Sequence, residues 1–294
     1  MKQKTIQHET SVHGKGLHLG KEAKVTFKPA KENSGICFVR LDLPGEPSIK
    51  AEYSNIIHQD ALSRCTSLKS GEAVVHTVEH LMAVLYGLEI DNLLIEINAE
   101  EMPGLDGSGQ EYYQALKKAV VIEQSADREF IDIKEPICLE NNGSSLVAMP
   151  GSELKVSYML DYGHPILGAQ FFSREVNAQI FESEIAPSRT FCLESEAQAL
   201  QQQGLGKGAS FTNTLVVTDK GVKNNKLRFP DEFVRHKVLD AVGDFYLLGK
   251  PIRGHILGMK SGHRLNRQML QKIVEQQEKY KKQFTPQAYA YEIG

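Results

Sequence analysis

Two segments of this chain follow the same order: an apolar segment with helical spacing, a Gly-x-x-Ile step and then a short strand. The first runs through Gly87 and Ile90 into LLIEINA, and the second runs through Gly249 and Ile252. Glycine commonly follows a helix, so the repeated spacing carries little weight alone. The repeat is compatible with an α+β fold built from two similar units.

Length and local patterns agree with two units of moderate size. The chain has 294 residues, of which 41% are hydrophobic, which is enough for one large domain or two smaller ones. Each half begins with short predicted strands, the first pair around a turn at residues 33–35. A charged segment at 127–130 resembles a seam, and we therefore expect domains at 1–126 and 127–294.

The bulk properties exclude several classes of protein. The net charge of −3 provides no cationic field for nucleic acid, and no apolar run reaches the roughly 18 residues of a membrane span. The N-terminus lacks the apolar run of a signal peptide. We expect a cytoplasmic monomer without a nucleic-acid partner and with four reduced thiols at Cys37, Cys65, Cys138 and Cys192.

The segment from Val78 to Leu88 predicts a helix that buries its apolar side but begins with ionisable groups. Glu79 and His80 lie side by side in its first turn. Burial of such groups is costly unless they are paired. Either they face solvent, or they bind a metal ion.

A second constellation lies on the predicted helix of LRFPDEFVRHKVLDAVGD. His236, Asp240 and Asp244 fall at i, i+4 and i+8, so the imidazole of His236 and the carboxylate of Asp240 share one face and can hold a divalent ion. An exposed polar stripe is the commoner explanation of this helix taken alone. With His80 as a third ligand and water in the fourth position, the set is typical of an open catalytic zinc site, and ferrous iron also accepts such ligands. Glu79 would then be the general base.

A rival interpretation uses the same helix start differently. His76 to His80 reads H-x-x-E-H, the pattern of inverzincin peptidases, in which both histidines bind zinc and Glu79 is the base. The pattern is short, and Thr77 resembles an N-cap, which would leave His76 just outside the helix. We therefore favour His76 as a bystander.

Three further residues are candidates for hydrolysis of an amide. His263, in a predicted loop before a helix at 266–282, is either an ordinary surface residue or the acid that protonates the departing amine. Asp244 could orient that imidazole. Thr190 is either a plain residue at a strand end or a donor to the oxyanion.

With these residues in place, the chain resembles the UDP-3-O-acyl-N-acetylglucosamine deacetylases, which perform the committed step of lipid A synthesis in Gram-negative bacteria. The resemblance runs nearly end to end, through GKGLHLG, TVEHLMAVLYGLEIDNLLIEIN, MPGLDGSG, SRTF, GLGKGASF, LRFPDEFVRHKVLDAVGD and KSGHRLN. It implies two stacked α+β domains, each a mainly antiparallel sheet packed against two helices, with the active site between them.

The resemblance also implies roles for individual residues. His80, His236 and Asp240 become the zinc ligands, Glu79 the general base, His263 the general acid, Thr190 the oxyanion donor and Asp244 the residue that orients His263. Lys237, Phe191, Gly208 and Ser210 become substrate-binding residues, the last two in an inserted element around 190–219 that would form a passage for the acyl chain.

Other points stay open at the level of the sequence. Lys207 interrupts the small residues of Gly204–Phe211, and we expect its charge to point away from the passage. The basic residues that hold the uridine diphosphate are undetermined, with Arg64, Lys237 and Arg264 as candidates. A non-catalytic nucleotide-sugar or lipid-binding protein on the same scaffold is a further alternative.

Overall fold

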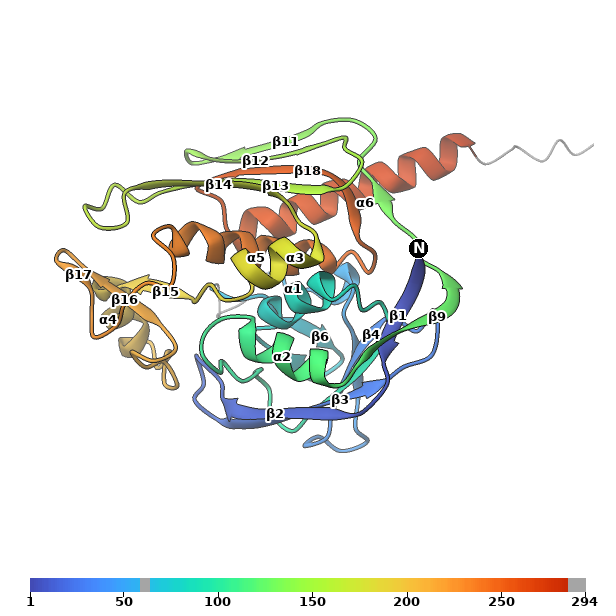
Figure 1. Ribbon diagram of the computed structural model, residues 1–294, viewed down its shortest axis with the longest axis horizontal. Coiled ribbons are helices and arrows are strands. Elements are labelled where there is room, and N and C mark those ends of the chain that lie inside the picture. Colours follow the sequence, from blue (N-terminus) through green and yellow to red (C-terminus); the bar gives the residue numbers. More distant parts are fainter. Residues whose placement is uncertain (59–63, 285–294) are drawn as a thin grey trace, which may run out of the picture.

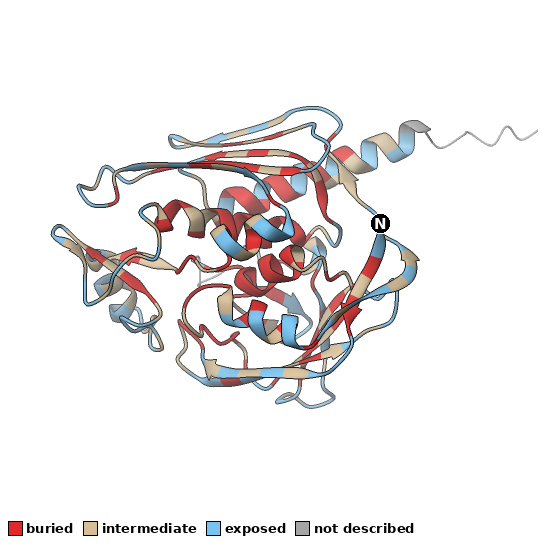
Figure 2. Cartoon of the chain, viewed as in Figure 1, coloured by how far each residue is buried: buried red, intermediate tan, exposed pale blue. Residues whose placement is uncertain are grey.

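The computed structural model describes residues 1–58 and 64–284 of the chain. Two sheets form the outer layers, and the main helices lie between them (Figure 1). The helices in this middle layer are mostly buried, whereas the outer sides of the sheets are mixed or exposed (Figure 2). The apolar core therefore runs through the helical layer from one sheet to the other.

The first sheet has five strands in the order β2-β3-β8-β4-β5. Its central strand β8 pairs antiparallel with β3 and parallel with β4. The turn at residues 33–35 thus joins two strands that are separated by β8, because the apolar β8 takes the central place. The strands are β2 (Thr10–Lys15), β3 (Glu22–Pro29), β4 (Ile36–Arg40), β5 (Ser48–Lys50) and β8 (Leu93–Ile97).

The second sheet repeats this arrangement in the order β11-β12-β18-β13-β14. Its central strand β18 likewise pairs antiparallel with one neighbour, β12, and parallel with the other, β13. A short strand, β10 (Ile131–Asp132), also pairs with β18. The strands are β11 (Ile137–Asn141), β12 (Ser144–Met149), β13 (Leu154–Asp161), β14 (Ala169–Glu175) and β18 (Ile252–Met259).

The helices follow the same order in both halves. In each, a helix precedes the central strand and another follows it. These helices are α1 (Glu79–Gly87) and α2 (Gln110–Lys118) in the first half, and α5 (Glu232–Tyr246) and α6 (His263–Phe284) in the second. The predicted α+β fold of two similar units is therefore confirmed.

Two strands join the halves at one edge. β1 (Lys2–Ile6) pairs antiparallel with β9 (Val121–Asp127), which leads into the second half. The expected boundary after residue 126 falls at the end of β9, and it stays a prediction. A hairpin of β6 (Leu68–Ser70) and β7 (Ala73–Val75) precedes α1, after a short 3-10 turn at Tyr53–Asn55.

An extra element lies at the end of the molecule opposite β1 and β9 (Figure 1). It follows α3 (Ala178–Ile180) and a π-helical turn (Phe181–Ile185), and it contains β15 (Phe191–Leu193), α4 (Glu194–Gln202), β16 (Leu215–Thr218) and β17 (Gly221–Val222). Its strands form a separate sheet in the order β15-β16-β17. It occupies the region where the sequence predicts an insertion.

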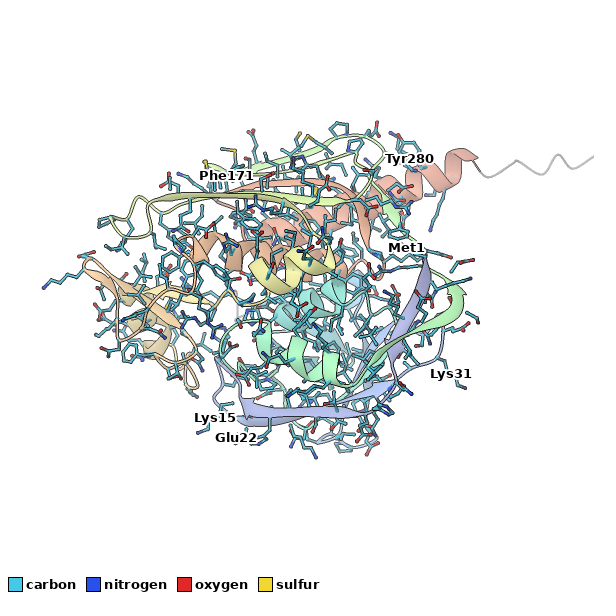
Figure 3. The ribbon with its side chains drawn as sticks, viewed as in Figure 1. Met1, Lys15, Glu22, Lys31, Phe171 and Tyr280 are labelled. Carbon is cyan, nitrogen blue, oxygen red and sulfur yellow. The ribbon has the colours of Figure 1, made fainter. Side chains whose placement is uncertain are left out.

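Exposed side chains mark the outer surfaces of the two sheets. Lys15 and Glu22 form an ion pair of 3.6 Å at the outer edge of the first sheet, and Phe171 lies on the outer side of the second (Figure 3). No helix in the described part of the chain is long and apolar enough to cross a membrane.

Candidate active site

The two halves and the extra element together surround a cavity of about 390 Å³. It lies at the N-terminal end of α1, where α5 and the start of α6 also meet. Almost all predicted functional residues line it, namely Glu79, His80, Thr190, Phe191, His236, Lys237, Asp240 and His263.

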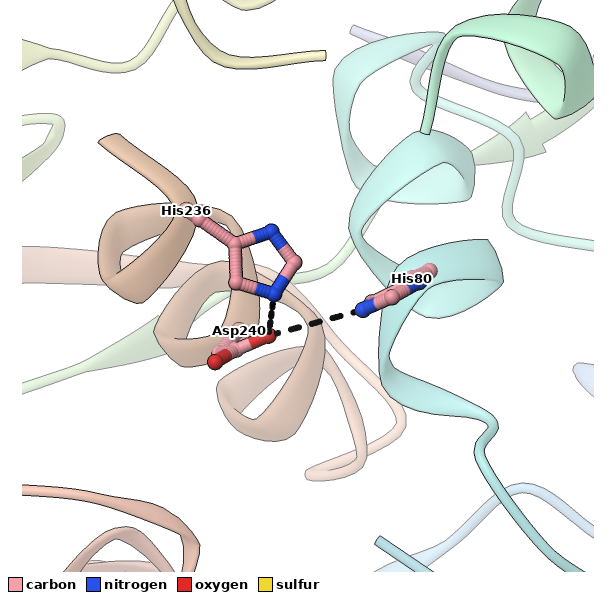
Figure 4. Close-up of side chains that lie close together, drawn as sticks. All are labelled: His80, His236 and Asp240. Atoms are coloured by element: carbon pink, nitrogen blue, oxygen red, sulfur yellow. Dashed lines mark ion pairs between the residues drawn. The ribbon is translucent and has the colours of Figure 1, made fainter. Parts of the chain in front are cut away.

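Three residues that line this cavity, His80, His236 and Asp240, converge on one another (Figure 4). His80 comes from α1, whereas His236 and Asp240 are one turn apart on α5. The Nε2 atoms of His80 and His236 lie 3.7 and 3.3 Å from Asp240 Oδ1. One ligand atom from each of the three residues lies within 4.8 Å of the others, and in the described residues this is the only such group.

The surroundings of these residues fit a bound cation. The Nδ1–H of His236 donates to the carbonyl of Ser188 at 3.1 Å, which leaves Nε2 as the free ligand atom. Asp240 Oδ1 is buried without a hydrogen-bond donor among the described residues, although buried polar atoms are normally satisfied. Lys237 Nζ donates to the other oxygen, Oδ2, at 2.7 Å. A cation between the two imidazoles would satisfy Oδ1.

The protonation states of these three side chains also favour binding of a cation. Burial, together with the neighbouring His236, lowers the pKa of His80 to about 3, and burial lowers the pKa of His236 as well. Both imidazoles are therefore neutral near pH 7. Burial opposes ionisation of Asp240, but the nearby cations of Lys237 and His263 outweigh it and lower the pKa of this carboxyl. The set thus offers two lone pairs and one negative charge.

Glu79 lies beside this group at the first position of α1. Its Oε2 accepts a hydrogen bond from the backbone N–H of Thr66 at 3.0 Å. Burial raises the pKa of Glu79 to about 7. A carboxylate with this pKa can accept a proton from water near neutral pH.

His263 lines the same cavity as Glu79 and is held by Asp244. His263 Nδ1 lies 2.8 Å from Asp244 Oδ2, which also accepts a hydrogen bond from Asn266. Burial would lower the pKa of His263, but Asp244 and Asp240 together raise it to about 9, so the imidazolium persists near neutrality. The prediction of a loop at this position is wrong. His263 is the first residue of α6, and the helix holds its side chain toward the cavity.

Thr190 and Phe191 enter the cavity from the start of the extra element. The N–H of Thr190 donates to the carbonyl of Gly107 at 2.8 Å, so a turn of the first half holds this segment. The ring of Phe191 lies edge-on to His236, with centroids 6.4 Å apart, and Lys237 Nζ lies 5.8 Å from the centroid of Phe191.

Gly208 and Ser210 lie outside the cavity lining, whereas Gly206 and Ala209 contribute to it. A Cβ atom at Gly208 would lie 2.1 Å from the carbonyl oxygen of Gly16, so only glycine fits where the extra element contacts the first half. The N–H of Ser210 donates to the side chain of Asn213, within the same turn. Lys207 is exposed and outside the lining, as expected.

His76 lies outside α1 and outside the metal-ligand group. Its Nδ1 lies 2.8 Å from the hydroxyl of Ser67. The predicted N-cap at Thr77 is wrong, because α1 begins after Val78. Thr77 instead has φ +60°, and its hydroxyl donates to Glu101. The H-x-x-E-H pattern therefore does not place both histidines on one helix.

Several residues of the site have no counterpart in the sequence predictions. Three of them make hydrogen bonds to candidate site residues: Thr66 to Glu79, Ser188 to His236 and Asn266 to Asp244. A fourth, Lys260, lines the cavity. Lys260 lies in the KSGHRLN motif, which could have identified it. Thr66 and Ser188 lie in irregular segments, where no periodic pattern indicates which way a side chain or carbonyl points.

Comparison with known proteins gives one family. The model of the family described as UDP-3-O-acyl N-acetylglycosamine deacetylase matches residues 3–275 of this chain. Proteins named UDP-3-O-acyl-N-acetylglucosamine deacetylase are similar over almost their whole length. The one from Nostoc sp. is 41% identical over 93% of this chain and 99% of its own length. The one from Chlamydia abortus is 40% identical over 93% of this chain and 97% of its own length. The one from Citrifermentans bemidjiense is 38% identical over 98% of this chain and 94% of its own.

Proposed function

The chain belongs to the UDP-3-O-acyl N-acetylglycosamine deacetylase family, and from this premise we propose that it removes the acetyl group of UDP-3-O-acyl-N-acetylglucosamine. As a member it is a hydrolase of a carbon–nitrogen bond other than a peptide bond. The reaction would release acetate and the free 2-amino sugar nucleotide, and it would be the committed step of lipid A synthesis. The observation that carries the proposal is the convergence of His80, His236 and Asp240 with Glu79 and His263 in one cavity.

His80, His236 and Asp240 would hold the metal ion, which we propose to be Zn²⁺. Two neutral imidazoles and one carboxylate are a common catalytic zinc set, and Fe²⁺ fits the same donors. When bound, the ion would supply Lewis-acid chemistry, which polarises a carbonyl and makes water more acidic.

Glu79 and His263 would share the proton transfers. Glu79, with its pKa raised to about 7, accepts a proton from the attacking water. His263, with its pKa raised to about 9, donates a proton to the departing amine, and Asp244 keeps its ring oriented at 2.8 Å. Thr190 lines the same cavity and would donate a hydrogen bond to the oxyanion formed on attack.

Other lining residues would bind the two ends of the substrate. Phe191 and Lys237 would contact the sugar, and the cations of Arg64, Lys260 and Arg264 would face the diphosphate. Ala197, Leu200, Gly206 and Ala209 of the extra element line the other part of the cavity, where small and apolar side chains suit an acyl chain. Gly208 and Ser210 would support this wall from behind.

Metal content and acetate release together test the proposal. The metal per chain is measured by elemental analysis, and acetate release from UDP-3-O-acyl-N-acetylglucosamine is assayed, for the wild type, His236→Ala and His76→Ala. We expect about one zinc and turnover in the wild type and His76→Ala, and loss of both in His236→Ala. If the zinc were lost in His76→Ala but kept in His236→Ala, the result would instead support the peptidase that uses His76, Glu79 and His80. Tight nucleotide-sugar binding without metal or product would support a non-catalytic binding protein.

A monomer in the cytoplasm, with its domain boundary after residue 126, remains our expectation for the protein. Size-exclusion chromatography with light scattering measures the oligomeric state directly.

A further inference from the structure

Thr66 makes hydrogen bonds both to the candidate base, Glu79, and to Asp244, the residue that holds the candidate acid, His263. It is fully buried, lies two residues before the start of β6 and is outside the cavity lining. On the side of α1, its N–H donates to Glu79 Oε2 at 3.0 Å and its carbonyl accepts from the N–H of Val78 at 3.2 Å. On the side of α5, its hydroxyl donates to Asp244 Oδ1 at 2.6 Å, and the same hydroxyl lies 3.3 Å from His263 Nδ1.

The hydroxyl of Thr66 completes the hydrogen bonding of a buried carboxylate. Asp244 is fully buried, and its Oδ2 accepts from His263 Nδ1 and from Asn266 Nδ2, both at 2.8 Å. Thr66 supplies the hydrogen bond to the other oxygen, Oδ1. With donors on both oxygens, the plane of the carboxylate is fixed, and so is the direction in which it holds His263.

We propose that Thr66 is a positioning residue for this reaction, which fixes the base Glu79 and the Asp244–His263 pair relative to one another. The inference rests on the proposed function, because it assigns Thr66 a role only if Glu79 and His263 transfer protons. The backbone and the hydroxyl of Thr66 contact different residues and have different roles. The backbone of Thr66 orients the base, and its hydroxyl orients the partner of the acid.

Thr66→Val separates these two contacts. Valine has nearly the same shape and keeps the backbone N–H to Glu79, but it removes the hydroxyl from Asp244. We expect kcat to fall about 10- to 100-fold, because a small misplacement of a catalytic group costs on this order. KM and the metal content per chain should stay close to wild type. Thr66→Ser, which restores the hydroxyl, should recover most of kcat.

A double-mutant cycle distinguishes positioning from loss of stability. If Thr66 acts through Asp244, then Thr66→Val should cost less than about twofold in kcat in an Asp244→Asn background. If the two substitutions acted independently, the fold-losses in kcat of the single variants would multiply in the double variant. Thr66→Ala, which places no methyl group against Asp244, repeats the cycle should the valine variant fail to fold.

Ser67→Ala is the matched control. Ser67 is the next residue and is also buried. Its hydroxyl contacts His76 Nδ1 at 2.8 Å and Cys65 Sγ at 3.8 Å, and neither partner belongs to the acid–base pair. This variant should keep the wild-type kcat.

Three results would overturn the inference about Thr66. They are a kcat for Thr66→Val within twofold of wild type, an equal loss in Ser67→Ala, or independent losses in the cycle. Wild-type protein that binds metal but releases no acetate would instead overturn the proposed function itself.

Discussion

Gly243 of α5 faces the backbone carbonyl of Glu79 of α1 so closely that a Cβ atom at position 243 would lie 2.0 Å from the carbonyl oxygen. The same Cβ would lie 3.0 Å from the backbone nitrogen of Ala83. Both obstacles are backbone atoms, which cannot rotate away. The two helices that carry the candidate metal ligands therefore touch at a point where only glycine fits.

Gly243→Ala should destabilise the protein and separate α1 from α5. Alanine favours a helix over glycine by only about 0.5–1 kcal/mol, whereas overpacking costs typically about 1–3 kcal/mol, so the clash should dominate. Denaturant unfolding measures the free energy, and chelator competition measures the metal affinity, which should fall as well. Gly262→Ala serves as the control, because a Cβ there meets nothing within 4 Å. Equal stability of both variants would contradict the close approach.

Glu79→Gln and His263→Gln should lower kcat without loss of metal. Each removes one proton-transfer group, which typically contributes about 10²- to 10⁴-fold, while the three candidate ligands stay in place. Acetate release and elemental analysis on the same samples check this. His76→Gln, a change of another imidazole outside the metal group, should keep full activity. Full activity in either of the first two variants would remove its assigned role.

The pH dependence of kcat/KM should be bell-shaped. Glu79 must be deprotonated to act as a base, so activity rises as pH increases through its pKa of about 7. His263 must be protonated to act as an acid, so activity falls as pH increases through its pKa of about 9. A bound cation favours the carboxylate of Glu79 and disfavours the imidazolium of His263. In the metal-loaded protein the acidic limb should therefore lie at or below 7 and the basic limb at or below 9. Assays from pH 5 to 10 test this, and a flat profile would be incompatible with the pair.

Removal of the metal should lower the melting temperature of the wild type. An ion bound by ligands from both halves stabilises the folded chain by roughly 4 kcal/mol at a free concentration 1,000 times its dissociation constant. Thermal unfolding with and without a chelator should therefore show a shift in the wild type and none in His80→Ala. A shift of the same size in that variant would place the ion elsewhere.

Ala197→Phe should discriminate against long acyl chains. Ala197 of α4 lines the cavity, and a phenyl ring there would narrow the proposed passage. We expect kcat/KM to fall more for a long-chain than for a short-chain substrate, by roughly 10-fold or more, because a blocked pocket excludes added methylenes. Ala199→Phe, on the exposed side of the same helix, is the control. Equal effects on both substrates would argue against the passage.

The sequence predicted those parts of the site that depend on helix periodicity. His236 and Asp240 are four residues apart, so any regular helix brings them together, and α5 does so. His80 could be joined to them only because the chemistry of a metal requires a third ligand. The contact itself depends on how α1 packs on α5, which no local pattern encodes.

Elements defined by tertiary contacts were harder to predict. The polar α4 has no apolar stripe of the kind that marks a buried helix, and it was not predicted. Ser108 and Glu111 have the spacing of a capping box in the sequence, but Ser108 bonds Asp106 instead and α2 begins at Gln110. Strand order was also beyond local patterns, since β8 lies between β3 and β4.

The matching order of strands and helices in the two halves has a consequence for the division of chemical labour. In a symmetric homodimer, every copy would have to carry the base, the acid and all metal ligands. In one continuous chain, equivalent positions are free to diverge. Here α1 carries Glu79 and one candidate metal ligand, His80, whereas its counterpart α5 carries the other two candidate ligands and Asp244. The molecule is in effect a covalent pseudo-dimer with a single asymmetric centre, and neither half alone holds a complete one.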